Sequence, residues 1–327
     1  MKKIITIIGV RPQFIKSAQV SMGIRKYFNE VIVHTGQHYD KNMSKIFFEE
    51  LDIPKPDYNL CIGSGNHGEQ TGKMMTEIEK ILIKENPEFV IVYGDTNSTL
   101  AGALVASKLH VKIVHIEAGL RSFDKRMPEE INRVCTDHIS DVLFCPTGIS
   151  VVNLKNEGIT QQVYKVGDVM YDAAILNSKI AEKKSNILEN LEIKPRDYLL
   201  ATIHRPSNTD SYRNMLSIID AFIKSGEKII FSLHPRTKKY LTDYNLSDRI
   251  KKSRNIITID PIGYLDMLVL EKNAKKILTD SGGVQKEAYF FSVPCITLRE
   301  TTEWVETVNH GWNLLVGTDK TKIVEAI

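Results

Sequence analysis

The predicted fold rests on one stretch, Thr279-Asp280-Ser281-Gly282-Gly283-Val284-Gln285-Lys286-Glu287. The apolar run Lys276–Leu278 before it predicts the end of a buried strand, and the helical spacing from Val284 to Phe291 predicts a helix after it. Gly282 and Gly283 allow a sharp turn and a close ligand, because neither has a Cβ atom. Free N–H groups at such a helix start attract anions, most often phosphate. A plain strand-to-helix turn explains this stretch about equally well when it is taken alone.

Short continuous apolar runs recur along the whole chain and alternate with helical patterns. In the first half they are Ile4–Val10, Val31–Thr35, Phe89–Tyr93, Lys112–Ile116, Val142–Cys145 and Val163–Val166. In the second half they are Tyr198–Ile203, Lys228–Leu233, Ile256–Ile259, Lys276–Leu278, Cys295–Leu298 and Leu314–Val316. Such runs predict parallel strands that are buried on both faces. Two series predict an α/β fold of two Rossmann-like doubly wound domains, which we place at residues 1–168 and 169–327.

The composition is that of a soluble globular protein, with 42% hydrophobic and 25% charged residues. The net charge of +3 is too small to indicate a nucleic-acid partner, and no apolar run is long enough to span a membrane. The four cysteines, Cys61, Cys135, Cys145 and Cys295, are far apart and form no CxxC motif. They predict reduced core thiols in a cytoplasmic protein.

The first ten residues and the last eight residues carry patterns of their own. Two lysines and the apolar run Ile4–Val10 imitate a signal peptide, but the run is short and lacks a cleavage site, so we expect a first strand there. Lys320–Ile327 predicts the start of a helix, which is consistent with a missing C-terminal segment.

Polar residues gather where the predicted strands end, which is where open α/β sheets bind ligands. In the first half they are Gly9, Arg11, Gln13 and Lys16, then Thr35-Gly36-Gln37-His38, Gly94-Asp95-Thr96, His115–Arg121 and Met127–Arg133. In the second half they are His204-Arg205, His234-Pro235-Arg236 and Ser281-Gly282-Gly283.

Each of these residues taken alone favours a structural role. Arg133, for example, follows Glu129 at i+4 and Glu130 at i+3, which is typical of an ion pair on a helix. A functional role becomes the better interpretation if Asp95, Glu117 and one of these two glutamates lie close together in the fold. Arg11 and His204 would then be the cationic groups beside them. Such a site would hold acids, a base and cations, which suits proton transfer next to a phosphate leaving group.

Several familiar motifs are absent from the sequence. Gly68–Met74 is one residue short of a P-loop, and Met74 replaces the Ser or Thr that would bind magnesium. The first turn, Gly9-Val10-Arg11-Pro12, is not GxGxxG, which argues against a nicotinamide or flavin cofactor. No HExxH motif or Cys/His cluster indicates a metal, and no GxSxG motif indicates an α/β-hydrolase.

Taken together, the motifs resemble those of the non-hydrolysing UDP-N-acetylglucosamine 2-epimerase family. They are Gly9–Gln13, Thr35–His38, Gly94–Thr96, His115–Arg121, Pro128–Arg133 and Thr279–Gly283, and they run in the family's order over nearly the whole chain. The resemblance implies a GT-B-like fold, with two domains facing across a cleft, and a homodimer. It also implies catalysis without a nicotinamide or metal cofactor.

The family's reaction implies a role for each matched residue. A base removes the C2 proton while UDP leaves C1, the glycal takes a proton on its other face, and UDP adds again. By resemblance the catalytic residues are Asp95, Glu117, Glu129 and His204. Which carboxylate removes the proton and which returns it stays open.

The resemblance also implies which residues bind the UDP-N-acetyl amino sugar. Ser281, Gly282 and Gly283 match the pyrophosphate turn, and Glu287 matches a ligand of the ribose hydroxyls. The remaining substrate-binding candidates are Arg11, Lys16, Gln37, His38, Glu130, Arg133, Arg205, Arg236 and Tyr264.

The chain also departs from the family's pattern. Trp304 stands where the family often has an arginine near the nucleotide, and it can stack but cannot make a bidentate contact. The loop Cys61–Gly72 lacks the arginine of an allosteric site found in some bacterial members. These changes resemble the branch that acts on UDP-2,3-diacetamido-2,3-dideoxyglucuronate, whose extra carboxylate would contact Arg236 or Lys238.

Three other functions remain as alternatives. A hydrolysing 2-epimerase would release free N-acetylmannosamine, and a GT-B glycosyltransferase would need an acceptor. A nucleotide-sugar sensor would lack acid and base residues, whereas Asp95, Glu117, Glu129 and His204 are all present.

Overall fold

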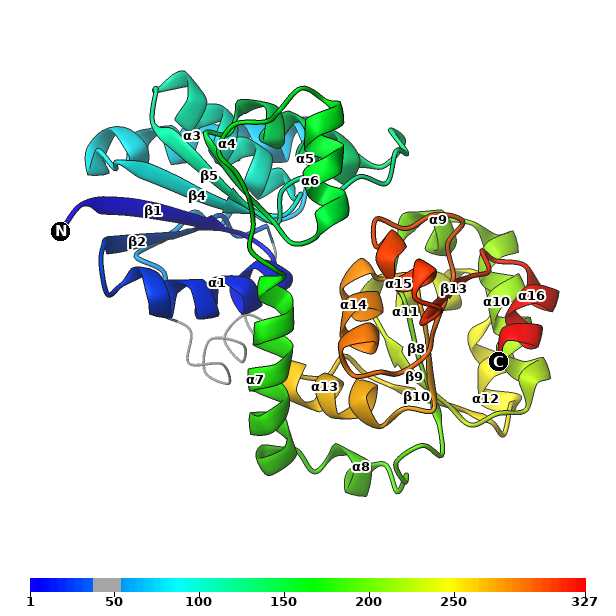
Figure 1. Cartoon of the computed structure of the whole chain (residues 1–327). Helices are drawn as coiled ribbons and strands as arrows, with labels where there is room; N and C mark the ends of the chain where they lie inside the picture. Colours follow the sequence, from blue (N-terminus) through cyan, green and yellow to red (C-terminus); the bar gives the residue numbers. More distant parts are fainter. Residues whose placement is uncertain (38–53) are drawn as a thin grey trace. The chain divides into compact units, whose positions relative to one another are not determined.

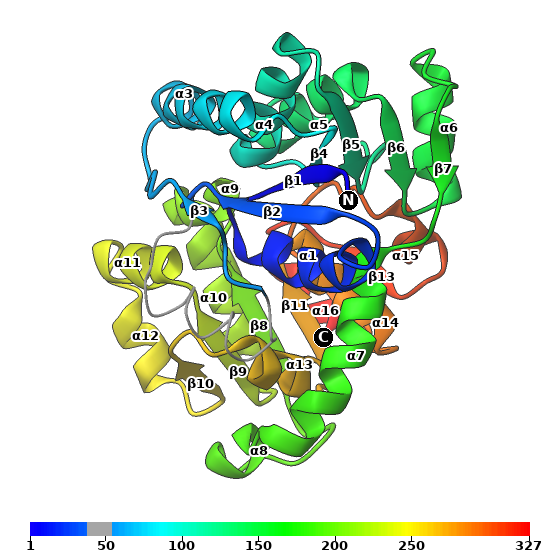
Figure 2. The same cartoon turned by 90° about the vertical axis from the view of Figure 1, so that its left-hand side faces the viewer.

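The computed structural model describes residues 1–37 and 54–327. The chain divides into two compact units, Met1–Ala173 and Ala174–Ile327, and the division falls within helix α7 (Val169–Lys184). Each unit contains one parallel sheet with helices on both faces (Figures 1 and 2).

The first unit is built on a seven-stranded sheet of order β3-β2-β1-β4-β5-β6-β7, in which all pairings are parallel. Its strands are β1 (Lys3–Ile8), β2 (Asn29–His34), β3 (Tyr58–Asn59), β4 (Phe89–Tyr93), β5 (Lys112–Ile116), β6 (Val142–Cys145) and β7 (Val163–Lys165). Its helices before α7 are α1 (Arg11–Ile24), α3 (His67–Glu85), α4 (Asn97–Lys108), α5 (Pro128–Ile139) and α6 (Gly148–Asn156).

The second unit repeats this plan with a six-stranded parallel sheet of order β10-β9-β8-β11-β12-β13. Its strands are β8 (Leu199–Ile203), β9 (Ile229–Leu233), β10 (Ile256–Ile259), β11 (Lys276–Thr279), β12 (Cys295–Thr297) and β13 (Asn313–Leu315). Its helices are α8 (Ile187–Asn190), α9 (Pro206–Thr209), α10 (Tyr212–Ser225), α11 (Pro235–Asp243), α12 (Ser247–Lys252), α13 (Tyr264–Asn273), α14 (Gly282–Phe290), α15 (Val305–Asn309) and α16 (Lys320–Ala326).

Both faces of each sheet are buried, which explains why the strands lack polar alternation. On β1, Ile5 and Ile7 belong to the core beneath α3 and α4, whereas Ile4 and Ile8 belong to the core that includes Phe14 of α1. In the second unit, α13 and α14 lie on one side of the sheet and α10, α12 and α16 on the other (Figure 1).

The twelve apolar runs all become strands, so the predicted α/β architecture is confirmed. The short strand β3 was not predicted, because its two residues carry no periodic signal. The run Ile4–Val10 supplies β1, and Lys320–Ala326 forms a helix as predicted. In the part of the chain that the structure describes, no helix is both long and apolar enough to cross a membrane.

The cysteine prediction needs a correction. All four thiols are free, but only Cys145 and Cys295 are buried, whereas Cys61 and Cys135 are exposed. Cys135 lies on the exposed face of the amphipathic helix α5, which the spacing of the cysteines in the sequence does not reveal. The two buried thiols are inert, since burial raises the pKa of Cys145 to about 11 and that of Cys295 to about 12.

The strand orders locate the ligand edge of each unit. The chain winds outward in one direction from β1 and in the other from β4, and it does the same from β8 and β11. Ligands of doubly wound sheets bind beyond the carboxyl ends of the strands at this switch point. The turns after β1, β4, β8 and β11 therefore form the expected ligand edges of the two sheets.

Candidate functional site

The turn after β1 is held by one glutamine. Gln13 accepts hydrogen bonds from the backbone N–H groups of Gly9 (2.7 Å) and Val10 (3.2 Å) through Oε1 and donates to the Tyr93 carbonyl (2.8 Å) through Nε2. It thus ties the end of β1 to the end of β4 across the switch point. Gly9 is required by close packing, because a Cβ there would lie 2.1 Å from the Ser98 Oγ.

A buried ion pair lies at the carboxyl ends of β1 and β5. The Nζ of Lys16, on α1, contacts the Oε2 of Glu117, and both side chains are less than a tenth exposed. Glu117 has a φ of +72°, and the N–H groups of Glu117 (3.1 Å) and Ala118 (3.0 Å) both donate to the Phe144 carbonyl. This irregular turn is costly for a residue with a side chain, and such strain is characteristic of functional positions.

The neighbouring turn leaves room for that carboxylate. Gly94 has a φ of +63°, and a Cβ on it would lie 3.2 Å from the Glu117 Oε2. A buried charged pair is weak as a stabilising device, because desolvation offsets most of its attraction. Its position at the ligand edge of the sheet therefore favours a chemical role.

A second set of charges surrounds Asp95, directly after β4. Arg133, buried on α5, contacts the carboxylates of both Asp95 and Glu130. Glu130 also accepts from the Ser122 N–H, the Ser122 hydroxyl and the Phe123 N–H, each at 2.9 Å. Glu130 is thus occupied in holding the 122–123 loop, whereas the Asp95 side chain is 31% exposed. Glu129, in the first turn of the same helix, is half-buried.

Behind these residues lies a buried network that fixes the end of β5. His115 pairs with Asp137 through Nδ1 (2.7 Å) and with the Gly94 carbonyl through Nε2 (2.8 Å), and Asp137 also pairs with Arg121 (2.7 Å). Burial would raise the pKa of Asp137, but the charges of His115 and Arg121 and their hydrogen bonds lower it below its ordinary value. The network holds the Gly94 turn against the strand that leads to Glu117.

In the second unit, one buried carboxylate organises the turn after β8. Asp280 accepts from the N–H groups of His204 and Arg205 and from the Asn208 side chain, each at 3.0 Å. The Nδ1 of His204 lies 3.5 Å from an Asp280 oxygen, and its ring is 35% exposed. A carboxylate at Nδ1 favours the tautomer that carries the proton there. The sequence alone does not reveal this role of Asp280, because its partners lie more than 70 residues earlier in the chain.

The predicted anion site has the expected local structure. Ser281 is the N-cap of α14, and its hydroxyl accepts from the Val284 N–H (3.4 Å). A Cβ on Gly282 would lie 2.3 Å from the Glu303 Oε1, whereas one on Gly283 would meet nothing closer than 3.8 Å. Gly282 is therefore needed for packing, and Gly283 leaves the helix start open for a ligand.

Trp304 is buried beside this turn. The Lys286 ammonium lies 4.1 Å from the centre of its ring, a cation–π contact, and the adjacent Glu303 pairs with Arg299 at 3.0 Å. At the position where the family often has an arginine, Trp304 is therefore a buried ring that packs against Lys286.

Other predicted residues are placed as follows. Tyr264 donates to the Glu287 Oε1 (2.8 Å), and both side chains are buried. The Gln37 Oε1 accepts from the Ser98 hydroxyl (2.7 Å), and Arg11 begins α1 half-buried. His38 lies outside the described residues.

The two cations expected near a sugar carboxylate have protein partners. Arg236 makes a two-pronged pair with Asp210 (2.5 and 2.6 Å), and Lys238 pairs with Asp260 (2.6 Å). Among the described residues, no group of three or more His, Cys, Asp or Glu side chains is placed to hold a metal ion.

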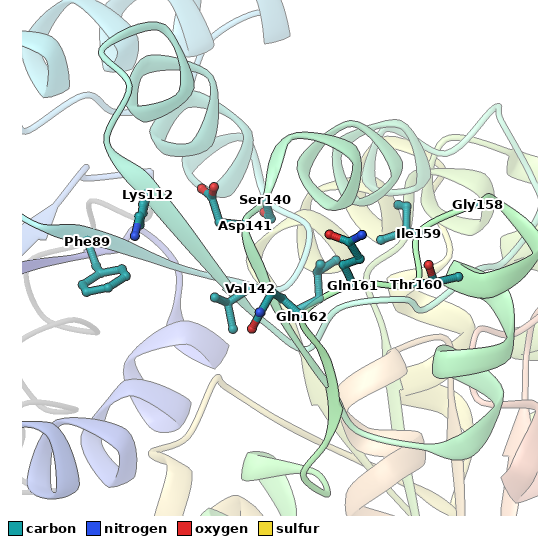
Figure 3. A pocket seen from close by; sticks show the side chains of 11 residues that line it. Phe89, Lys112, Ser140, Asp141, Val142, Gly158, Ile159, Thr160, Gln161 and Gln162 are labelled. Carbon is teal, nitrogen blue, oxygen red and sulfur yellow. The ribbon is translucent and has the colours of Figure 1, made fainter.

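A cavity of about 670 Å³ lies at the opposite edge of the first sheet, where strands β4, β5 and β6 begin (Figure 3). Its lining includes Lys112 and Asp141 but none of the predicted site residues. Because the acid and base groups lie at the carboxyl ends of these strands, chemistry rather than volume identifies the candidate site.

Comparison with known proteins agrees with this geometry. A family model described as UDP-N-acetylglucosamine 2-epimerase matches residues 22–327. A "UDP-N-acetylglucosamine 2-epimerase homolog" from Methanococcus maripaludis is 63% identical, over 99% of this chain and 91% of the relative. A UDP-2,3-diacetamido-2,3-dideoxy-D-glucuronate 2-epimerase from Pseudomonas aeruginosa is 51% identical, with the same coverage of each chain.

A solved structure extends the agreement to the fold. The UDP-GlcNAc 2-epimerase of Methanocaldococcus jannaschii, crystallised with UDP-GlcNAc and UDP, matches with a TM-score of 0.94 and 53% identity, over 100% of this chain and 91% of that one. The GT-B-like fold class is thereby confirmed. The chain belongs to the UDP-N-acetylglucosamine 2-epimerase family, whose non-hydrolysing members are isomerases.

Proposed function

We propose that this enzyme inverts C2 of UDP-N-acetylglucosamine by eliminating and re-adding UDP, and so forms UDP-N-acetylmannosamine. The observation that carries the proposal is the set of carboxylates after the adjacent strands β4 and β5. Asp95 contacts Arg133 and Glu117 contacts Lys16, so each of these two carboxylates has a cation to hold it in place.

The reaction needs two proton-transfer groups and a site for the departing diphosphate. Asp95, Glu117 and Glu129 of the first unit are the proposed acid and base groups. Arg11, Lys16 and Arg133 orient them and the sugar, and Gln37 and Glu130 are further proposed substrate-binding residues. His38, which lies outside the described residues, stays a predicted substrate-binding residue. The assignment of the two proton transfers among the three carboxylates stays open.

The second unit is proposed to bind UDP. The open start of α14, from Ser281 to Gly283, offers N–H groups to the diphosphate. His204, oriented by Asp280, stabilises the charge that develops as UDP leaves, with Arg205 beside it in the same turn. Glu287 accepts from the ribose hydroxyls, and Tyr264 supports it.

A second substrate has one specific observation in its favour, the 51% identity to an enzyme named for UDP-2,3-diacetamido-2,3-dideoxy-D-glucuronate. Its extra carboxylate would need a cation, but Arg236 and Lys238 are already paired with carboxylates. We therefore favour the neutral sugar. We also propose a cytoplasmic homodimer that supplies precursors of surface polysaccharides.

Product analysis tests the proposal. The protein is incubated with UDP-N-acetylglucosamine, and the sugars are separated by anion exchange. We expect a mixture of two UDP-sugars that is reached from either direction. Free N-acetylmannosamine would indicate hydrolysis instead, and turnover of only the diacetamido uronic acid would favour the second substrate.

A further inference from the structure

The second unit contains a buried acid that the proposed mechanism does not use. Glu271, near the end of α13, is fully buried. Among the described residues, no hydrogen-bond donor reaches either of its carboxyl oxygens. An ionised carboxylate without donors is very costly in such a place, so the group must be neutral. Burial, followed by the nearby Glu287, raises the pKa of Glu271 well above its ordinary value of 4.5.

The groups around Glu271 indicate which of them could accept its proton in a hydrogen bond. Helix α13 packs against α14, and after burial the nearby Glu287 on α14 is the main cause of the raised pKa of Glu271. The other titratable groups that interact with Glu271 are Tyr198, Tyr264 and Cys295. All three are neutral at pH 7, because burial raises the pKa of each. Glu287 is therefore the natural acceptor for the Glu271 proton.

Two adjacent carboxyl groups are stable when they share one proton, with one as donor and the other as acceptor. Glu271 is fully buried, whereas Glu287 is 5% exposed, so Glu271 is the better place for the proton. Tyr264 lies two turns earlier on the same face of α13 and donates to Glu287 at 2.8 Å. One helix thus presents two donors to one carboxylate of the next helix.

The position of Glu287 on α14 suits the binding of a nucleotide ribose. Glu287 follows Gly283 by four residues, so the two lie on the same face of α14, about 6 Å apart along the axis. That spacing suits a nucleotide whose diphosphate lies at the helix start and whose ribose lies one turn beyond it. A carboxylate whose rotation is already fixed accepts from two neighbouring hydroxyl groups at a lower entropic cost.

We propose that Glu271 is a positioning residue that, as a neutral acid, donates a hydrogen bond to Glu287 and fixes its carboxylate for the two ribose hydroxyls of the nucleotide. The proposal rests on the assignment of Glu287 as the ribose ligand. It adds a residue that acts through Glu287 and makes ribose recognition depend on pH.

The test compares the binding of UDP and 2′,3′-dideoxy-UDP to the full chain by calorimetry. Glu271→Gln keeps an N–H donor at similar volume, and Glu271→Met keeps the volume without a donor. A hydrogen bond to a charged group typically changes affinity by about tenfold or more. We expect the native protein and Glu271→Gln to prefer UDP by about tenfold or more, and Glu271→Met to lose most of this preference while binding dideoxy-UDP normally.

A matched control separates positioning from helix packing. Leu268 is fully buried on the same helix, so Leu268→Ala should lower the melting temperature and leave the preference for UDP intact. If Glu271→Met fails to fold, the pH dependence replaces it. The preference of the native protein for UDP over 2′,3′-dideoxy-UDP should then fall at alkaline pH. The same preference in Glu271→Gln should not change.

Different failures have different meanings. Full retention of the UDP preference in folded Glu271→Met, or a preference of the native protein that does not change up to pH 10, would overturn the role of Glu271. If the native protein binds both nucleotides equally, Glu287 is not the ribose ligand, and both that part of the proposed function and this inference fail.

Discussion

At the scale of single residues, Glu117 is the clearest test of the proposed acid–base set. Glu117→Gln keeps the shape and removes the charge, so we expect kcat to fall by about 100-fold or more. The Kd for UDP should change little, because the proposed UDP ligands belong to the second unit. Glu88→Gln is the matched control, since Glu88 makes an exposed ion pair with Lys2 just before β4. Equal activity of Glu117→Gln and the control in a coupled epimerase assay would remove Glu117 from the mechanism.

The raised pKa of Glu271 predicts how the free energy of unfolding depends on pH. Its pKa is raised in the folded state, so its contribution is complete below the ordinary value of 4.5 and is lost as pH rises toward the folded-state pKa. Glu271→Gln does not titrate. Urea unfolding measured from pH 5 to pH 9 should therefore show that the free energy of unfolding of Glu271→Gln rises relative to that of the native protein. The increase should be up to about 1.4 kcal/mol per pH unit. Parallel curves would mean that Glu271 titrates normally.

At the scale of elements, the two glycines that begin α14 should behave differently. Gly282→Ala places a Cβ against Glu303, which is itself buried and paired with Arg299, so we expect about 1–3 kcal/mol of destabilisation. In Gly283→Ala the new Cβ makes only an ordinary contact with the Ser281 Oγ at 3.8 Å, so the free energy of unfolding should stay within about 0.5 kcal/mol of the native value. If a phosphate approaches there, Gly283→Ala should still weaken UDP binding. Equal loss of stability in both variants, measured by urea unfolding, would contradict this description of the turn.

The elements were more predictable from sequence than the contacts of the site. Buried parallel strands are continuous apolar runs, so twelve strands were visible, whereas the two residues of β3 were not. Glu117 adopts a positive φ where its N–H group and that of Ala118 both donate to the Phe144 carbonyl of β6. No local sequence pattern predicts this pairing. Glu271 follows Leu268–Leu270 but precedes Lys272, so the sequence alone does not separate it from an exposed acid. Burial and partners of charged groups are tertiary properties, and they come only from the fold.

At the scale of the whole molecule, the homodimer remains a prediction. Sedimentation velocity at micromolar concentration should give about twice the mass of one chain, as cyclic dimers are the commonest oligomers. A concentration-independent mass of one chain would contradict it.

The proposed reaction also makes no use of a redox cofactor or metal. Lysine, arginine and histidine side chains supply the positive charge, so treatment with EDTA followed by gel filtration should leave kcat within about twofold. Loss of activity that is restored by a divalent cation would contradict this part of the mechanism.

The most direct test of the central claim is proton exchange at C2. The protein is incubated with UDP-N-acetylglucosamine in heavy water, and the sugar is followed by proton NMR. Elimination and re-addition predict that the C2 proton signal disappears as deuterium enters and that UDP-N-acetylmannosamine appears with UDP still attached. No exchange at C2, with this sugar and with the diacetamido uronic acid alike, would contradict the account.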